Sequence, residues 1–226
     1  MSSLAEELTR LRRMLLAMSA EVELRVDQAF DSLLRRDVRK AEEVKRGDDA
    51  IDQFDVNIET VCVEILALHQ PVAVDLRFVL AALRVNADLE RIGDLARGIA
   101  KRAIKLGERR PIALPEPLVE MTNNVRAILA ESLRSLAEQD EDRARRVRES
   151  DEPINRNYHA VFKWAAREVA EHGEEAKAVI DVLSAVRGIE RIADLATNIA
   201  ESVIFAVEGQ IVRHVHAPGA LRSDRE

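Results

Sequence analysis

One stretch of helical sequence occurs twice in this chain, one hundred residues apart. ERIGDLARGIA covers residues 90–100 and ERIADLATNIA covers residues 190–200, with eight of eleven positions identical. A period of this length exceeds the roughly 20–50 residues of solenoid and propeller repeats, so it indicates a duplicated domain. The chain is therefore expected to fold as two related halves.

Apolar residues recur at steps of three and four along almost the whole chain, which is the spacing of amphipathic helices. The first helix is expected to end at the turn Arg36-Asp37. The later helices are expected to cover about 38–68, 74–106, 117–138, 141–171 and 174–208. Pro71 ends the second of the six helices, because proline lacks a backbone donor. Pro153 either kinks the fifth or lies in the first turn of a new helix that starts at Ser150-Asp151.

The clearest linker runs from Gly107 to Pro117 and contains three prolines and a glycine. It divides the chain into a first three-helix bundle, residues 1–109, and a second, residues 110–226, with a tail that frays from about 212. Short connections between long helices favour antiparallel neighbours. The predicted fold is all-α: two tandem pseudo-symmetric three-helix bundles made of six long antiparallel helices.

Composition excludes several classes of protein. A net charge of −7 and only 3% aromatic residues argue against binding to nucleic acid. No apolar run is long enough to span a bilayer, which favours a cytoplasmic protein and leaves peripheral membrane contact open. The single cysteine, Cys62, lies in VCVEIL and is interpreted as a small buried residue.

Both copies of the repeat carry a Glu and an Asp four residues apart, which places the two carboxylates on one strip of the helix. In each copy this strip lies beside the apolar face. Like charges at this spacing destabilise a helix by a few tenths of a kcal/mol, so an offset is needed. Either a neighbouring cation, such as those of Arg77, Arg84 and Arg91, or a bound metal ion would supply it.

The preceding helix of each half offers a matching pair of oxygen-bearing side chains. If it packs against the helix of the repeat, two pairs converge in each half, a ligand set that suits hard cations and iron. The candidate ligands are Asp48, Asp52, Glu90 and Asp94 in the first half and Asp151, Asn155, Glu190 and Asp194 in the second. Iron, zinc or magnesium is the expected ion, with the first site favoured. Duplication of a solvated acidic face is the other interpretation.

Catalytic motifs are missing from the sequence. There is no Glu-x-x-His on a helix, which disfavours a carboxylate-bridged metal oxidase. Phosphate-binding glycine loops and nucleophile elbows are also lacking. His214 and His216 have a spacing that a metal could use, whereas His69, His159 and His172 are interpreted as structural.

Two long stretches carry a resemblance to a known family. QPVAVDLRFVLAALRVNADLERIGDLA (70–96) and GIERIADLATNIAESVIFAVEGQIVRH (188–214) resemble the two signatures of the PhoU family of bacterial phosphate-transport and phosphate-signalling regulators. The resemblance covers almost the whole chain. This chain departs from the pattern at Leu195, where His is frequent, at Gly98, where Asn is frequent, and at Asn155, which replaces a carboxylate.

The resemblance implies a cytoplasmic, non-enzymatic negative regulator that dimerises. It implies a relay between the ATPase side of a phosphate ABC transporter and a sensor histidine kinase. It also implies metal on the four acidic pairs named above. A helical metal-binding or structural adaptor with no link to phosphate is the alternative.

Overall fold

The computed structural model describes residues 2–47, 49–150 and 152–210, and all regular structure in these ranges is helical. The first half contains α1 (Leu4–Arg35), α2 (Val38–Arg46), α3 (Asp49–His69) and α4 (Ala73–Gly107). The second half contains α5 (Glu116–Glu138), α6 (Glu141–Arg148), α7 (Glu152–Glu171), a 3-10 turn (Gly173–Glu175) and α8 (Ala176–Glu208). The prediction of an all-α fold is confirmed.

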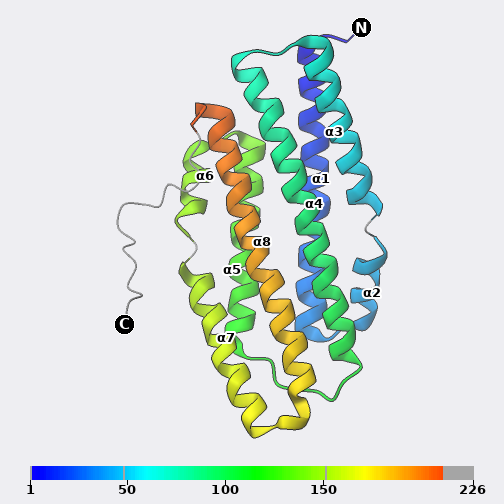
Figure 1. Cartoon of the computed structure of the whole chain (residues 1–226), viewed down its shortest axis with the longest axis vertical. Helices are drawn as coiled ribbons and strands as arrows, with labels where there is room; N and C mark the ends of the chain where they lie inside the picture. The colour runs from blue at the N-terminus through cyan, green and yellow to red at the C-terminus, as the bar shows by residue number, and fades with distance from the viewer. Residues whose placement is uncertain (1, 48, 151, 211–226) are drawn as a thin grey trace.

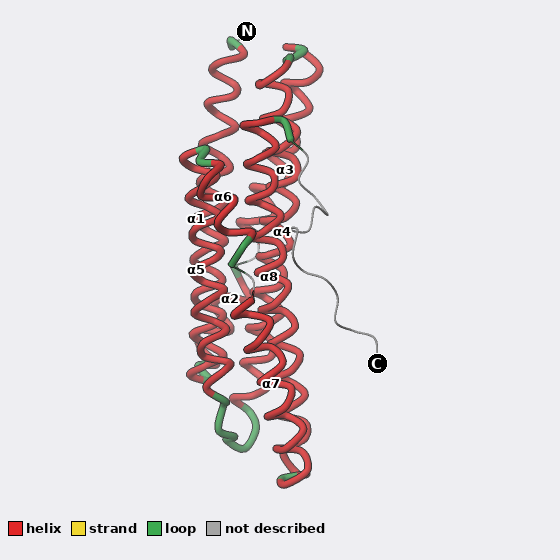
Figure 2. The backbone as a smooth tube through the Cα atoms, turned by 90° about the vertical axis from the view of Figure 1, so that its left-hand side faces the viewer, coloured by secondary structure: helices red, strands yellow, loops and turns green. Residues whose placement is uncertain are grey.

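The molecule is an elongated bundle in which α4 and α8 lie side by side at the centre and run in opposite directions (Figure 1). The long helices α1 and α5 pack behind them. Each half thus repeats one arrangement: a long first helix, then two shorter helices, α2 and α3 or α6 and α7, and then a long central helix. A view from the side shows the same long helices stacked in depth (Figure 2).

The hydrophobic core is continuous across both halves. Its stripe on α8 contains the residues predicted from the repeat: Ile189, Ile192, Ala193, Ala196, Ile199 and Val203. Cys62 is fully buried as expected, and burial raises the pKa of its thiol to about 12. Residues 108–115 form the predicted linker between the halves.

The prediction of one continuous helix over 38–68 is wrong, because α2 ends at Arg46 and α3 begins at Asp49. Arg25 of α1 supplies the physical reason. Its Nη1 donates to the carbonyl of Val44 at 3.2 Å, and its guanidinium fills the space where a side chain on Gly47 would stand. A side chain on α1 therefore caps the end of α2.

The fifth predicted helix is divided as well, into α6 and α7. Pro153 lies in the first turn of α7, so the second of the two alternatives is the correct one. The two halves break at corresponding places, although only the second half has a proline there.

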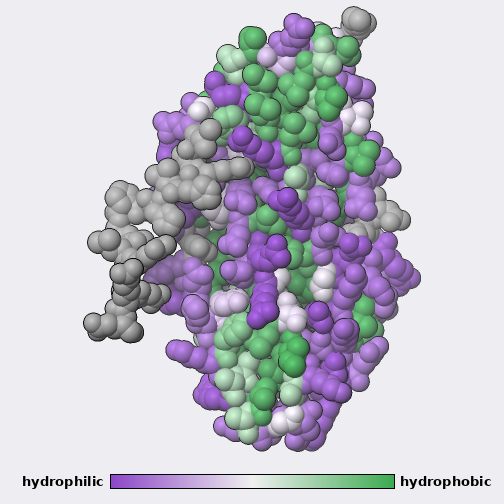
Figure 3. Space-filling view, viewed as in Figure 1, coloured by the Kyte–Doolittle hydropathy of each residue, from purple (hydrophilic) through white to green (hydrophobic). Residues whose placement is uncertain are grey.

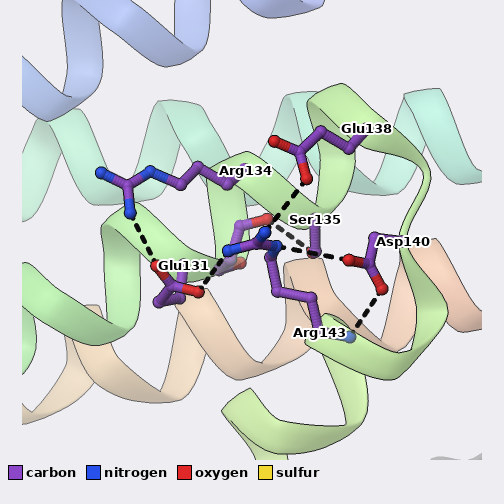
Figure 4. A network of polar contacts seen from close by, with 7 residues as sticks. Glu131, Arg134, Ser135, Glu138, Asp140 and Arg143 are labelled. Carbon is purple, nitrogen blue, oxygen red and sulfur yellow. Dashed lines mark hydrogen bonds and ion pairs between the residues drawn. The ribbon is translucent and has the colours of Figure 1, made fainter.

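The start of α6 is held by a network around Arg143 (Figure 4). The Asp140 carboxylate caps the helix by accepting from the backbone N–H of Arg143 at 2.8 Å. The Arg143 guanidinium donates to Glu131 at 2.7 Å and to Glu138 at 3.1 Å. These contacts fasten the end of α5 to the start of α6. In the first half, Asp37 caps α2 in the same way.

Candidate functional site

An acidic cluster forms where α3 and α4 pack together. Asp52 and Asp94 are exposed and Glu90 is half-buried. The pKa of Glu90 is raised, first by burial and then by the negative charges of Asp94, Asp55 and Asp52. Asp52, Glu90 and Asp94 are therefore close enough for their charges to interact, as expected for antiparallel neighbouring helices.

The cluster contains two residues that were not predicted, Asp55 and Asn86. Asn86 is 3% exposed, and its Nδ2 donates to Asp55 Oδ1 at 2.6 Å and to the Asp55 backbone carbonyl at 3.1 Å. Its Oδ1 is buried with no hydrogen-bond partner in the part of the chain that the structure describes. Burial is the first cause that raises the pKa of Asp55, followed by repulsion from Glu59. A signal existed in the sequence, since Asn86, Glu90 and Asp94 continue the same four-residue spacing.

Arginines offset part of the negative charge of the acidic cluster, but two of the three that were expected to do so contact α8 instead. Arg97 pairs with Asp94, and Arg91 lowers the pKa of Glu90 from its otherwise raised value. Arg77 and Arg84 contact α8 instead, where Arg77 donates to the Ala206 carbonyl at 3.4 Å and Arg84 lies over the Phe205 ring at 4.5 Å. The interpretation of Arg77 and Arg84 as partners of the acidic strip is therefore not supported by these contacts.

The second half does not repeat the whole arrangement. Asn155 of α7 and Asp194 of α8 are exposed, and Glu190 is half-buried. The position equivalent to Asn86 is Val186, which is fully buried. The position equivalent to Asp55 is Tyr158, whose ring lies 4.7 Å from that of Phe162. The hydrogen bonds from Asn86 to Asp55 therefore cannot form at the equivalent positions, because Val186 has no side-chain donor. Asp48, Asp151, His214 and His216 lie outside the described residues.

The donor set on α3 and α4 fits a cation chemically. Carboxylate oxygens and an amide oxygen are the ligands that hard cations prefer, and the Asn86 Oδ1 atom lacks a partner among the described residues. Within the described ranges, however, ligand atoms from three His, Cys, Asp or Glu residues lie within 4.8 Å of one another only at Glu168, His172 and Glu175. The acidic side chains on α3 and α4 would therefore have to turn to share one ion.

Replacing Glu90 by glutamine is expected to stabilise the metal-free protein at pH 7. The raised pKa means that the folded state holds the proton of Glu90 more tightly than the unfolded state does. The free energy of unfolding therefore falls as the pH rises through this pKa and the carboxyl ionises. Removing one like charge from the i, i+4 pair gains a few tenths of a kcal/mol, or about 1 °C in Tm. The gain should vanish near pH 4, where the carboxyl is protonated. Thermal melts in EDTA at both pH values measure it.

The control for this change is Glu64→Gln, at an exposed position of the neighbouring helix α3. It should leave Tm unchanged at both pH values. A Glu90→Gln protein that melts lower than the wild type at pH 7 would contradict the repulsion.

The fold and the cluster define a class: an all-helical protein of two related halves with a carboxylate face between two helices of the first half. None of the helices in the described residues is both long and apolar enough to cross a membrane. The PhoU domain family model matches residues 15–103 and 118–203, one match in each half. The chain therefore belongs to the PhoU family.

Curated relatives align along most of their lengths. The chain is 38% identical over 212 residues to a phosphate-specific transport system accessory protein PhoU homolog of Pseudomonas aeruginosa, covering 92% of this chain and 87% of the relative. It is 36% identical over 213 residues to the PhoU homolog of Aquifex aeolicus, covering 94% and 96%.

Solved structures of the family share the fold. The crystal structure of PhoU from Pseudomonas aeruginosa matches with a TM-score of 0.87 at 36% identity, covering 92% of this chain and 100% of that chain. PhoU from Streptococcus pneumoniae, described as a phosphate transport system regulatory protein, matches with a TM-score of 0.86 at 29% identity. It covers 93% of this chain and 99% of that chain.

Proposed function

We propose that this protein is a non-enzymatic negative regulator of phosphate uptake and of the transcriptional response to phosphate. The observation that carries the proposal is its alignment, over about nine-tenths of the chain, with relatives named as accessory proteins of a phosphate-specific transport system. The fold supports it, because the chain matches a phosphate transport regulatory protein along its length. The proposed site of action is the cytoplasm.

The proposed mode of action is that of an adaptor between the ATPase side of a phosphate ABC transporter and a sensor histidine kinase. Large apolar side chains at the turn between α3 and α4 support a role in protein contact. Leu68 is 69% exposed, Val72 is 74% exposed and Val74 is 58% exposed. Exposed apolar surface of this kind is what association with another protein removes from water.

Deletion of the gene in its host tests the regulatory role. A phosphate-responsive reporter should become active in phosphate-rich medium and return to repression when the intact gene is restored. Unchanged repression in the deletion strain would refute the phosphate link. It would favour the alternative, a helical metal-binding or structural adaptor that serves another system.

We further propose that metal binds the acidic pairs, with iron, zinc or magnesium as the ion. In the first half, Asp52, Asp55, Glu90 and Asp94 would hold it, together with Asp48. Its chemistry there would be electrostatic, because burial and then the repulsion of the neighbouring carboxylates raise the pKa of Glu90, and a cation would neutralise these carboxylates. Bound metal would thus fasten α3 to α4. The second half, with Asp151, Asn155, Glu190 and Asp194, carries less charge, so weaker occupancy is proposed there.

Asp94→Asn is expected to lower the metal content of the purified protein by at least half. The change removes one carboxylate while it keeps the shape of the side chain. Elemental analysis after loading with each ion, followed by removal of the unbound ion, measures the effect. Asp142→Asn, an exposed acid on α6, is the control. Equal metal in the two variants would remove Asp94 from the site.

A homodimer is proposed as the working form. Light scattering on the purified chain across a range of concentrations tests this state directly, and a mass that stays at the 25.3 kDa of one chain would refute it.

A further inference from the structure

A groove of about 640 Å³ runs between the C-terminal half of α4 and the N-terminal half of α8. Six cationic side chains line it, although the chain as a whole carries a net charge of −7. They are Lys45, Lys101, Arg102, Lys105, Arg187 and Arg191. Hydrophilic residues cover the middle of this face in Figure 3. The groove is distinct from the acidic cluster except at Asp94, which stands at one end.

Four of the six cations form two opposed rows. Lys101 and Lys105 are one turn apart on α4, and Arg187 and Arg191 are one turn apart on α8. All four are exposed, and among the described residues no acidic side chain forms an ion pair of 4.0 Å or less with Lys101, Lys105 or Arg191. Flexible ammonium groups on one wall and guanidinium forks on the other are well suited to phosphate oxygens.

The floor of the groove, between the two rows of cations, is apolar. Ile99 is buried and Leu95 is half-buried, both within the lining. Gly98 leaves the floor open, because a Cβ at this position would meet no atom within 4 Å. Apolar floor beside charged walls suits a ligand with a flat organic part and an anionic part. The volume also lies within the range of about 300–1,000 Å³ that small-molecule sites occupy.

The duplicated half shows that this groove is not a by-product of the fold. At the offset of one hundred residues, Lys101 corresponds to Glu201 and Lys105 to Phe205. The Arg84 guanidinium stacks over the Phe205 ring at 4.5 Å and fills the equivalent place. Arg187 and Gly188 correspond to Ala87 and Asp88, so at these two positions the equivalent place has a buried acid instead of an arginine, whereas Arg191 keeps its counterpart in Arg91.

One pair of corresponding positions differs in charge between the two halves. In the second half, Arg148 of α6 pairs with Glu201 of α8 at 3.3 Å. The corresponding residues of the first half are Lys45 and Lys101, two cations that line the same groove. An ion pair in the second half therefore corresponds to two cations in the first half, whose positive charge a bound anion would offset. Lys45 keeps one acidic neighbour, Glu42, at 3.7 Å.

We propose that this groove binds a phosphorylated small molecule of nucleotide size, with its phosphates between the rows of α4 and α8 and its organic part on the floor. Asp94 and Glu108 mark the two ends of the lining along α4, a distance of about 21 Å at 1.5 Å per residue. These two carboxylates repel an extended acidic peptide at the ends and confine an anion to the middle. The proposal does not depend on the phosphate-transport role.

Binding of a fluorescent ATP analogue to the full chain, in EDTA to exclude metal bridging at Asp94, tests the site. The double variant Lys101→Gln with Lys105→Gln should raise Kd at least tenfold. The matched control is Lys163→Gln with Arg167→Gln, an exposed pair of the same spacing on α7, and it should leave Kd unchanged. Equal Kd values in the two double variants would overturn the proposal.

Gly98→Phe tests the floor without a change of charge. It should also raise Kd at least tenfold, and a melting curve close to that of the wild type shows that the bundle is intact. Competition then identifies the ligand class. ATP should displace the analogue at a lower concentration than inorganic phosphate or an acidic peptide does. Displacement by either of these at the same or lower concentration would overturn the assignment to a nucleotide-sized ligand.

Discussion

Truncation of Ile99 to alanine should lower the free energy of unfolding by about 2–5 kcal/mol, which is the usual cost of deleting a buried Ile side chain. Ile99 is 1% exposed and lies on α4 against α8. The contact is close, because a Cβ on Gly188 would lie 3.2 Å from Ile99 Cγ1. The neighbouring backbones are long regular helices, so they cannot collapse readily into the cavity. Tm should fall by roughly 4–20 °C.

Urea unfolding followed by circular dichroism measures the loss. Val63→Ala, at a position of α3 that is 56% exposed, is the control and should change stability by less than about 0.5 kcal/mol. An Ile99→Ala protein within that same limit would contradict a core that is continuous between α4 and α8.

The second large effect is expected at Asp181, whose carboxylate joins the two halves. It is 3% exposed and accepts from Arg102 Nη1 at 3.0 Å and from Arg109 Nε at 2.9 Å. Asp181→Ala should cost about 1–3 kcal/mol. This is less than the loss at a fully buried pair, because the side chains of Arg102 and Arg109 are 37% and 33% exposed and can return to water.

A double-mutant cycle with Arg109→Ala separates the ion pair from the effect of truncation. The two changes should be non-additive, since each removes the same contact. Asp142→Ala, on the exposed side of α6, provides the comparison. Additive losses at Asp181 and Arg109 would show that this contact contributes nothing to the joining of the halves.

The acidic site shows which residues the spacing in the sequence can predict to lie together and which it cannot. Asp52, Glu90 and Asp94 were expected together because the spacing of four residues places side chains on one strip of a helix. Asp55 was missed, although it lies only three residues after Asp52, because its link to α4 depends on how the two helices face each other. The hydrogen bond from Asn86 shows this facing geometry. Metal occupancy at these residues stays a prediction.

The division into residues 1–109 and 110–226 also stays a prediction. We propose it as an evolutionary boundary, which the two separate family matches at 15–103 and 118–203 support. The hydrophobic cluster nevertheless runs through both halves, and the ion pairs of Asp181 cross the boundary. The halves are therefore expected to unfold together.

The sequence by itself determined the helices, the duplication and the buried faces of this protein. Each follows from local spacing, because side chains three and four residues apart share one side of a helix. Only the tertiary structure decided where α2 and α3 separate and where the basic groove lies. The break depends on Arg25, which reaches Gly47 from another helix. The groove combines cations from α2, α4 and α8, and contacts between residues distant in the chain leave no periodic trace in the sequence.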